Sequence, residues 1–413
     1  YLRSYYPNVA TYIPDRYEEG YGVSYKGIDF AEDNGFTLII ALDCGVKAIE
    51  KVAYAKDKGI DFIICDHHRP STILPNAIAV LDPKRQDCSY PYDELCGCGV
   101  GFKLIQALGS HRGETIDDLV YYLDLVATAI GADIVTITGE NRILAFYGLQ
   151  VINQQPRIGF KAIIDQLNKK ELTITDVVFI IAPRINAAGR MKHGQYAVNL
   201  LTETNMAQAV KFAAEIETFN TDRKGLDKAI TEEALVQIKE NDEEEGFTSV
   251  VYNASWHKGV IGIVASRLIE TYYRPTLVFT KHQFEKVVKE TIEPQLLTPE
   301  ITIDTIITLQ DLTPKLMRIL KQFAPFGPGN MSPVFMAENI KDTGYAKGVG
   351  ANAAHLKISV VQQDSYKIDG IGFNMGDKLP MVTSRKPFNA VFSLDENEWQ
   401  GTVSLQLKLK DIK

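Results

Sequence analysis

The sequence predicts an α/β protein with a parallel sheet in its first part and a small antiparallel barrel in its last part. Three observations predict this fold class. Apolar runs alternate with amphipathic stretches over residues 1–140, a long amphipathic stretch occupies residues 205–241, and short alternating runs fill residues 334–409. Strands that alternate with helices are typical of parallel sheets, whereas many short alternating strands are typical of antiparallel ones.

Length and composition are those of a globular protein with several domains. The 413 residues correspond to two or three domains of ordinary size. Hydrophobic residues make up 45% and charged residues 23%, which excludes a disordered chain. The net charge of −8 excludes a uniformly basic coat for nucleic acid, although a local basic groove stays possible. Since no apolar stretch approaches the roughly 20 residues that span a bilayer and no signal peptide opens the sequence, we expect a cytoplasmic protein without membrane contact.

Three apolar runs in the first part each end in an aspartate. They are residues 36–42 before Asp43, residues 62–65 before Asp66, and residues 77–81 before Asp82. Right-handed crossovers place the carboxyl ends of parallel strands on one edge of the sheet, where open α/β sheets bind ligands. The sequence therefore predicts that several carboxylates gather at this edge.

Helical patterns separate this sheet from a second, smaller α/β region. Residues 115–133 have a helical pattern that ends at Asp133, and residues 205–241 predict one or two helices that would span about 54 Å if continuous. Residues 248–280 then have the pattern strand, helix, strand. We therefore expect four segments. They are an α/β domain with a helical extension at 1–200, a connecting helix at 201–245, a second, apparently incomplete α/β domain at 246–295, and a barrel at 296–413.

The last part has the pattern of a small barrel. Short alternating runs cover residues 334–336, 356–361, 366–373, 388–394 and 402–409. Five such strands fit the five-stranded OB-fold, an architecture that binds oligonucleotides in many proteins. Basic residues slightly outnumber acidic ones in residues 301–413, unlike in the rest of the chain. The barrel is therefore the relatively basic part of the protein.

A carboxylate and two imidazoles come directly after the second predicted strand. Asp66, His67 and His68 offer oxygen and nitrogen ligands without a thiolate, a set that favours Mn²⁺, Mg²⁺, Fe²⁺ or Zn²⁺. The tripeptide alone is equally compatible with an ordinary surface turn. Asp43 ends the neighbouring strand and Asp133 ends a predicted helix, and these two carboxylates favour the metal site.

Seven motifs follow one another along the chain. They are LDCG at 42–45, DHH at 66–68, LDPKR at 81–85, ADIV at 132–135, PRINAAGRM at 183–191, WHKGVIGIVASR at 256–267 and FAPFGPGN at 323–330. In this order they resemble the DHH phosphoesterase family and, within it, the RecJ exonucleases. The resemblance covers nearly the whole chain. It implies a DHH catalytic domain, a DHHA1-like substrate-binding domain and a C-terminal OB-fold.

The resemblance also implies an activity and a catalytic site. The activity is metal-dependent hydrolysis of single-stranded DNA by a 5′-to-3′ exonuclease that releases nucleotides, in DNA repair and recombination. The implied catalytic residues are Asp43, Asp66, His67, His68 and Asp133. Among these, the metal ligands would be Asp43, His67 and Asp133, while Asp66 and His68 orient ligands or phosphate. The implied cofactor is Mn²⁺, as two ions, with Mg²⁺ as a substitute.

Further residues are implied to hold DNA or its phosphates. They are Arg184, Asn186, Arg190, His257, Ser266 and Arg267. Arginine is a natural bidentate partner of phosphate. Without the resemblance, the arginines would be assigned to a solvated helix terminus, and a capping role for His257 is equally compatible with its position. The implied partners are single-stranded DNA with a 5′ end and a single-strand-binding protein or a helicase.

Two features depart from the family pattern. Family members carry an Asp-x-Asp-Gly motif on an earlier strand, and the sequence from Tyr1 onward does not contain it. The junction from Thr280 to Phe284 is too short for the Gly-Ser-rich turn and the Gly-Gly-His segment of the family. We expect that both segments belong to a longer chain and are missing from this sequence.

These departures leave two other functions open. One is a DHH phosphodiesterase of short oligonucleotides or cyclic dinucleotides, a class that generally has no such OB-fold. The other is a catalytically silent DHH scaffold within a replication complex, which retention of the five catalytic residues disfavours.

Overall fold

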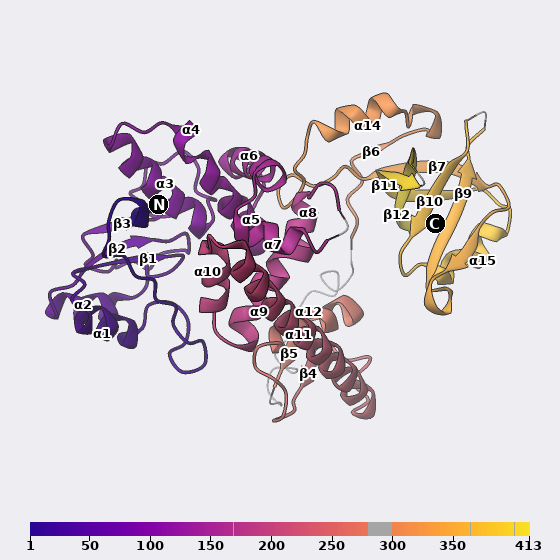
Figure 1. Ribbon diagram of the computed structural model, residues 1–413. Helices are drawn as coiled ribbons and strands as arrows, with labels where there is room; N and C mark the ends of the chain where they lie inside the picture. Colours follow the sequence, from indigo (N-terminus) through magenta and orange to yellow (C-terminus); the bar gives the residue numbers. More distant parts are fainter. Residues whose placement is uncertain (168, 280–299, 364, 400) are drawn as a thin grey trace. The chain divides into compact units, whose positions relative to one another are not determined.

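The computed structural model describes all residues except 168, 280–299, 364 and 400, and it places them in two units, Tyr1–Pro299 and Glu300–Lys413 (Figure 1). Each unit has a hydrophobic core of its own. No helix of the described residues is long and apolar enough to cross a membrane. The predicted junction at Thr280–Phe284 lies outside the described residues.

A parallel sheet opens the first unit, as the apolar runs predict. Its strands lie in the order β1 (Leu38–Leu42), β2 (Asp61–Cys65) and β3 (Ala79–Leu81). In the register of the sheet, Cys65 pairs with Leu42 on one side and with Leu81 on the other. Because these three residues end their strands side by side, the aspartates that follow them leave the sheet at the same level.

Helices cover both faces of this sheet. The helices α1 (Tyr25–Asp33) and α2 (Ile49–Asp57) share a core with one face, which includes Phe62 and Ile64. The other face belongs to the core that also contains α3 (Gly97–His111). The alternation of side chains along β2 explains this division, because successive residues of a strand point to opposite faces.

A helical region follows the sheet. It contains α4 (Ile116–Leu119), α5 (Leu123–Asp133), α6 (Gly139–Gln154), α7 (Ile158–Ile164), α8 (Ile174–Asp176), α9 (Ala182–Met191), α10 (Gln195–Thr202) and the long α11 (Met206–Glu240). One buried ion pair joins its helices: Arg157, before α7, makes two hydrogen bonds of 2.6 Å to Asp124 of α5. The predicted helical stretch at 205–241 is one continuous helix, α11, and it lies within the first unit.

The second α/β region is small. The strands β4 (Ser249–Val251) and β5 (Thr276–Val278) pair in parallel, and α12 (Ile261–Tyr272) lies between them in the sequence. Their apolar side chains form a core with the C-terminal half of α11, around Ile230, Ala234 and Ile238. The predicted strand–helix–strand pattern is therefore confirmed.

The second unit is a barrel, because the last long strand in the sheet order pairs with the first long strand and closes the sheet. The five predicted strands are present as β7 (Phe335–Asp342), β9 (His355–Val361), β10 (Ile368–Gly372), β11 (Phe388–Trp399) and β12 (Thr402–Ile412). They pair in the order β7-β11-β12-β10-β9, and β9 pairs again with β7. The sequence did not predict the short strands β6 (Thr305–Ile306) and β8 (Lys347–Val349), or the helices α14 (Pro314–Lys321) and α15 (Leu379–Thr383).

Candidate metal centre

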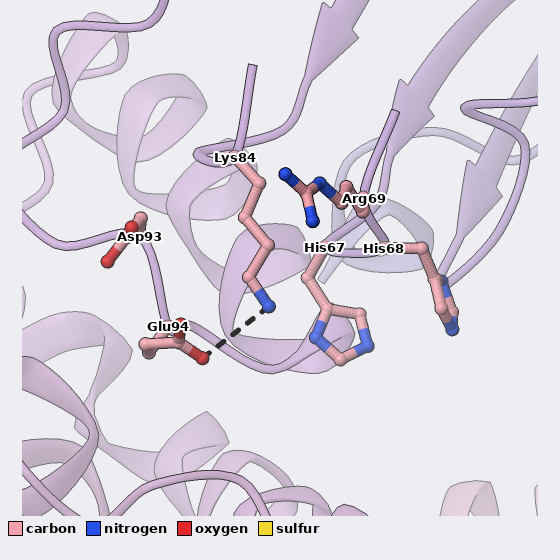
Figure 2. Close-up of a pocket in the computed structure, with 6 residues that line it drawn as sticks. All are labelled: His67, His68, Arg69, Lys84, Asp93 and Glu94. Carbon is pink, nitrogen blue, oxygen red and sulfur yellow. Dashed lines mark ion pairs between the residues drawn. The ribbon is translucent and has the colours of Figure 1, made fainter. Parts of the chain in front are cut away.

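The candidate metal centre lies where β1 and β2 end, beside the cavity drawn in Figure 2. Asp43 follows β1 with a left-handed backbone, φ 62°, a conformation that Asp and Asn adopt more readily than most residues. The Asp43 N–H donates a 2.8 Å hydrogen bond to the carbonyl of Cys65, which extends the ladder by one residue. Gly45, at φ 113°, then turns the chain toward α2.

Two carboxylates from different elements converge on His67. Its Nε2 atom lies 3.1 Å from Oδ1 of Asp43 and 3.4 Å from Oδ2 of Asp133, the last residue of α5. The hydrogen bond to Asp43 raises the pKa of His67, and the charge of Asp133 raises it further against the effect of burial. The side chains of Asp43 and Asp133 are 62% and 47% exposed, so the group is open to a substrate.

Asp66 is buried beneath this group and orients the two histidines. Its carboxylate accepts hydrogen bonds from the backbone N–H groups of Val46, His67 and His68, and it contacts His68 Nδ1 at 2.7 Å. Burial alone would raise the pKa of Asp66, but these hydrogen bonds outweigh it and lower the pKa. The carboxylate of Asp66 thus holds Nδ1 of His68, and Nε2 of His68 stays available as a further metal ligand, beyond the orienting role that the resemblance implies.

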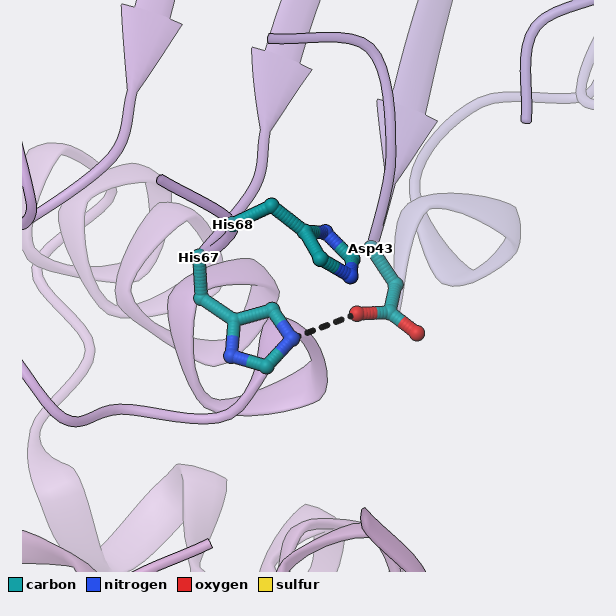
Figure 3. A group of neighbouring side chains, drawn as sticks. All are labelled: Asp43, His67 and His68. Carbon is teal, nitrogen blue, oxygen red and sulfur yellow. Dashed lines mark ion pairs between the residues drawn. The ribbon is translucent and has the colours of Figure 1, made fainter. Parts of the chain in front are cut away.

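The donor set fits a divalent metal ion. The ligand atoms of Asp43, His67 and His68 all lie within 4.8 Å of one another, and Figure 3 shows the three side chains directed toward one space. Asp133 adds a second carboxylate, 3.4 Å from His67 Nε2. Carboxylate and imidazole ligands without thiolate suit Mn²⁺, Mg²⁺, Fe²⁺ or Zn²⁺. The exposed side of the group leaves positions for water and a phosphate oxygen.

A cavity of about 520 Å³ adjoins the group. His67 and His68 line it together with Arg69, Lys84, Asp93 and Glu94 (Figure 2). The ammonium group of Lys84 lies 3.4 Å from Glu94, whereas Arg69 is exposed and has no ion pair among the described residues. The sequence analysis missed these four residues as part of the site. Arg69 is adjacent to the two histidines and Lys84 follows the third strand, but Asp93 and Glu94 carry no signal in the sequence.

The predicted DNA-contact residues of α9 are bonded within the protein or exposed. Arg184 forms a 2.5 Å ion pair with Glu217 of α11, and Asn186 is exposed. Arg190 donates a 3.2 Å hydrogen bond to the carbonyl of Gly259. These bonds join α9 to its neighbours, and none of them involves a residue of the metal centre.

The predicted residues near α12 also have internal partners. His257 Nδ1 accepts a 3.0 Å hydrogen bond from the N–H of Gly259 within the turn that precedes α12, and α12 itself has no side-chain cap. Ser266 donates to a carbonyl of its own helix. Arg267 makes two hydrogen bonds of 2.8 Å to the buried carboxylate of Asp227 on α11. A DNA contact by any of these residues stays a prediction.

Family models match both ends of the chain. The model of the DHH family, N-terminal domain, matches residues 1–130, and the model of the RecJ OB domain matches residues 303–411. Among curated relatives, the single-stranded-DNA-specific exonuclease RecJ of Bacillus subtilis is 30% identical over 98% of this chain, and that of Salmonella typhimurium is 29% identical over 98%. This chain spans 57% of the length of the first relative and 82% of the second.

Solved structures agree with these matches. RecJ of Thermus thermophilus in complex with Mn²⁺ has a TM-score of 0.80 over 94% of this chain and 63% of its own, at 22% identity, and it shares the fold. An exonuclease RecJ bound to manganese is 30% identical, with a TM-score of 0.59 over 66% of this chain and 68% of its own. The predicted resemblance is therefore confirmed, and the chain belongs to the DHH family, in its RecJ group.

Proposed function

We propose that the protein is a metal-dependent exonuclease that degrades single-stranded DNA from the 5′ end and releases nucleotides, in DNA repair and recombination. The observation that carries this proposal is the group formed by Asp43, His67, His68 and Asp133, which is open to solvent at the end of a parallel sheet. The closed barrel of the second unit supports a nucleic-acid substrate, because OB-folds hold single strands by stacking and backbone charge. The curated RecJ relatives are named single-stranded-DNA-specific exonucleases, and two RecJ structures contain Mn²⁺.

The side chains of the centre would hold the metal ion and orient its ligands, and the metal ion would supply the chemistry. When bound by Asp43, His67, His68 and Asp133, Mn²⁺ or Mg²⁺ would activate water and stabilise charge on the phosphate oxygens. Asp66 keeps the His68 ring in one tautomer and one orientation, which preserves the geometry of the donor set. Arg69, which lines the adjoining cavity and is exposed, would contact a phosphate of the strand through its guanidinium group. A helicase or a single-strand-binding protein in the cytoplasm would supply such strands.

A group of arginines near α9, α11 and α12 supports contact with the DNA backbone. Burial lowers the pKa of Arg223, and the charges of Arg190 and Arg267 lower it further, with only Asp227 opposing them. The Nε atom of Arg223 and the Nδ2 atom of the fully buried Asn220 have no hydrogen-bond partner among the described residues. Positive charge that exceeds its counter-charge favours a nearby phosphate, although the two unpaired donors are themselves buried and would not contact it directly.

Arg223→Met is therefore expected to weaken binding of single-stranded DNA. The plot of log binding constant against log salt concentration should become shallower by about one, as expected for the loss of one phosphate contact. Fluorescence anisotropy at several salt concentrations measures both quantities. The matched control is Lys224→Met, which removes the same charge from the exposed neighbouring residue. An equal effect of both variants would show that Arg223 contributes only through the overall positive charge and makes no specific phosphate contact.

Digestion of labelled DNA tests the function. With Mn²⁺, the protein should shorten a 5′-phosphorylated single strand from its 5′ end to nucleotides, while the same sequence as a blunt duplex resists, and a chelator should stop the reaction. Labels at the 5′ and the 3′ end, in separate substrates, establish the direction. Equal digestion of strand and duplex, or hydrolysis of a cyclic dinucleotide in place of the strand, would contradict the proposal.

A further inference from the structure

Gly97 lies against the carboxylate of Asp43. It is the first residue of α3, it is buried, and it follows Cys96, whose Sγ accepts a 3.3 Å hydrogen bond from the N–H of Gly99. A Cβ atom built on Gly97 would lie 2.1 Å from Oδ1, 2.6 Å from Cγ and 2.7 Å from Cβ of Asp43. Real Cβ atoms essentially never come within 3.0 Å of another heavy atom outside their own residue and its neighbours. No side chain therefore fits at Gly97 while Asp43 keeps its place.

Rotation of the Asp43 side chain cannot relieve this contact. A change of χ1 moves the carboxylate but leaves Cβ where the backbone holds it, and that atom is itself too close. The backbone of Asp43 is held in its left-handed conformation by the hydrogen bond to the Cys65 carbonyl. Accommodation of a side chain at Gly97 would therefore displace either the end of β1 or the start of α3.

We propose that Gly97 is a positioning residue of the metal centre: the missing Cβ lets the first turn of α3 close on Asp43 and hold its carboxylate 3.1 Å from His67 Nε2. Gly97 is not among the glycines with positive φ, so space rather than backbone freedom requires glycine at this position. The inference rests on the proposed function, since it concerns the same site.

Two other glycines near the start of α3 provide matched comparisons. A Cβ on Gly99 would make an ordinary contact of 3.5 Å with Cys96 Sγ. A Cβ on Gly101, one helical turn beyond Gly97, would lie 3.3 Å from Leu42 Cδ2 and would touch no residue of the metal centre. Gly99→Ala is therefore the control, because it adds the same methyl group to the same helical turn at a position with room for it.

The test is a calorimetric titration of the wild type and each variant with Mn²⁺ alone, in the absence of DNA. Gly97→Ala should lower the Mn²⁺ affinity about 10- to 100-fold, the range found for residues that orient metal ligands. Gly99→Ala should bind as the wild type does. A crystal structure of metal-free Gly97→Ala should show the Asp43 carboxylate farther from His67 Nε2 than the present 3.1 Å. Thermal unfolding in chelator separates this effect from a general loss of stability.

The outcomes separate this inference from the proposed function. Mn²⁺ affinity of Gly97→Ala equal to that of Gly99→Ala, or an unmoved Asp43 in its structure, would overturn the inference even if the wild type digests DNA. A wild type that binds Mn²⁺, together with a Gly97→Ala variant that binds it weakly, would support the inference even if neither protein digests single strands.

Discussion

Asp43→Asn is expected to lower the rate of Mn²⁺-dependent digestion of single-stranded DNA by at least about 100-fold, because outer-shell partners alone are worth about 10- to 100-fold. The variant replaces the carboxylate next to His67 Nε2 by a neutral amide of the same shape. Asparagine also tolerates the left-handed backbone at this position, φ 62°, so the fold should persist. Asp43→Ala would add backbone strain to the loss of the ligand. The assay is release of nucleotides from a labelled strand.

Asp61→Asn is the matched control for this experiment. Asp61 is an exposed carboxylate at the start of β2, at the opposite end of the strand from the metal centre. The control should digest DNA at the wild-type rate. Unfolding of metal-free Asp43→Asn by urea should match that of the wild type, which would place the defect in the site. Digestion by Asp43→Asn at more than a tenth of the wild-type rate would refute the assigned role of Asp43.

Arg157→Met is expected to destabilise the first unit by about 3–5 kcal/mol, the cost of leaving one partner of a buried ion pair without its counter-charge. Asp124 is fully buried, and both of its carboxylate oxygens accept hydrogen bonds from Arg157. The same guanidinium donates to the carbonyl of Leu201, at the end of α10. Urea unfolding gives the free energy, and hydrogen exchange in α5 localises the loss.

Two further variants provide a control and a rescue for this measurement. Lys161→Met removes one partner of the exposed i,i+4 pair between Lys161 of α7 and Asp165, the residue after α7, and it should change stability by no more than about 0.5 kcal/mol. Adding Asp124→Leu to Arg157→Met should restore much of the lost stability, since no buried charge is then left without a partner. A loss below about 1 kcal/mol for Arg157→Met would show that water reaches Asp124.

The sequence was most informative where an apolar run matches a strand and the topology of the sheet then fixes where that strand ends. Buried parallel strands are apolar runs with sharp ends, so the position of Asp43, Asp66 and Asp82 at one level of the sheet follows from the chain itself. The barrel strands β9, β10, β11 and β12 were visible because each is long enough to show alternation, whereas the run predicted at 334–336 covers only the start of β7. The strands β6 and β8, at 2 and 3 residues, are too short to alternate, and they form because longer strands lie beside them.

The interior of the site depends on contacts that sequence spacing does not encode. The burial of Asp66 beneath His68 arises from a turn whose backbone N–H groups all point at one carboxylate. The closeness of Gly97 to Asp43 depends on how α3 packs on the sheet, over a separation of more than 50 residues. The internal bonds of Arg184 and Arg267 likewise come from partners on α11. A motif identifies such residues but does not say what they touch.

The strand β1 has a neighbour on only one side among the described residues, with Leu38 and Leu42 exposed along it. An unpaired strand edge presents a row of free N–H and C=O groups, and it is a template for another strand. A strand that adds here, from this polypeptide or from a second molecule, would run beside Asp43. Pairing at this edge of the sheet would therefore change access to the metal centre.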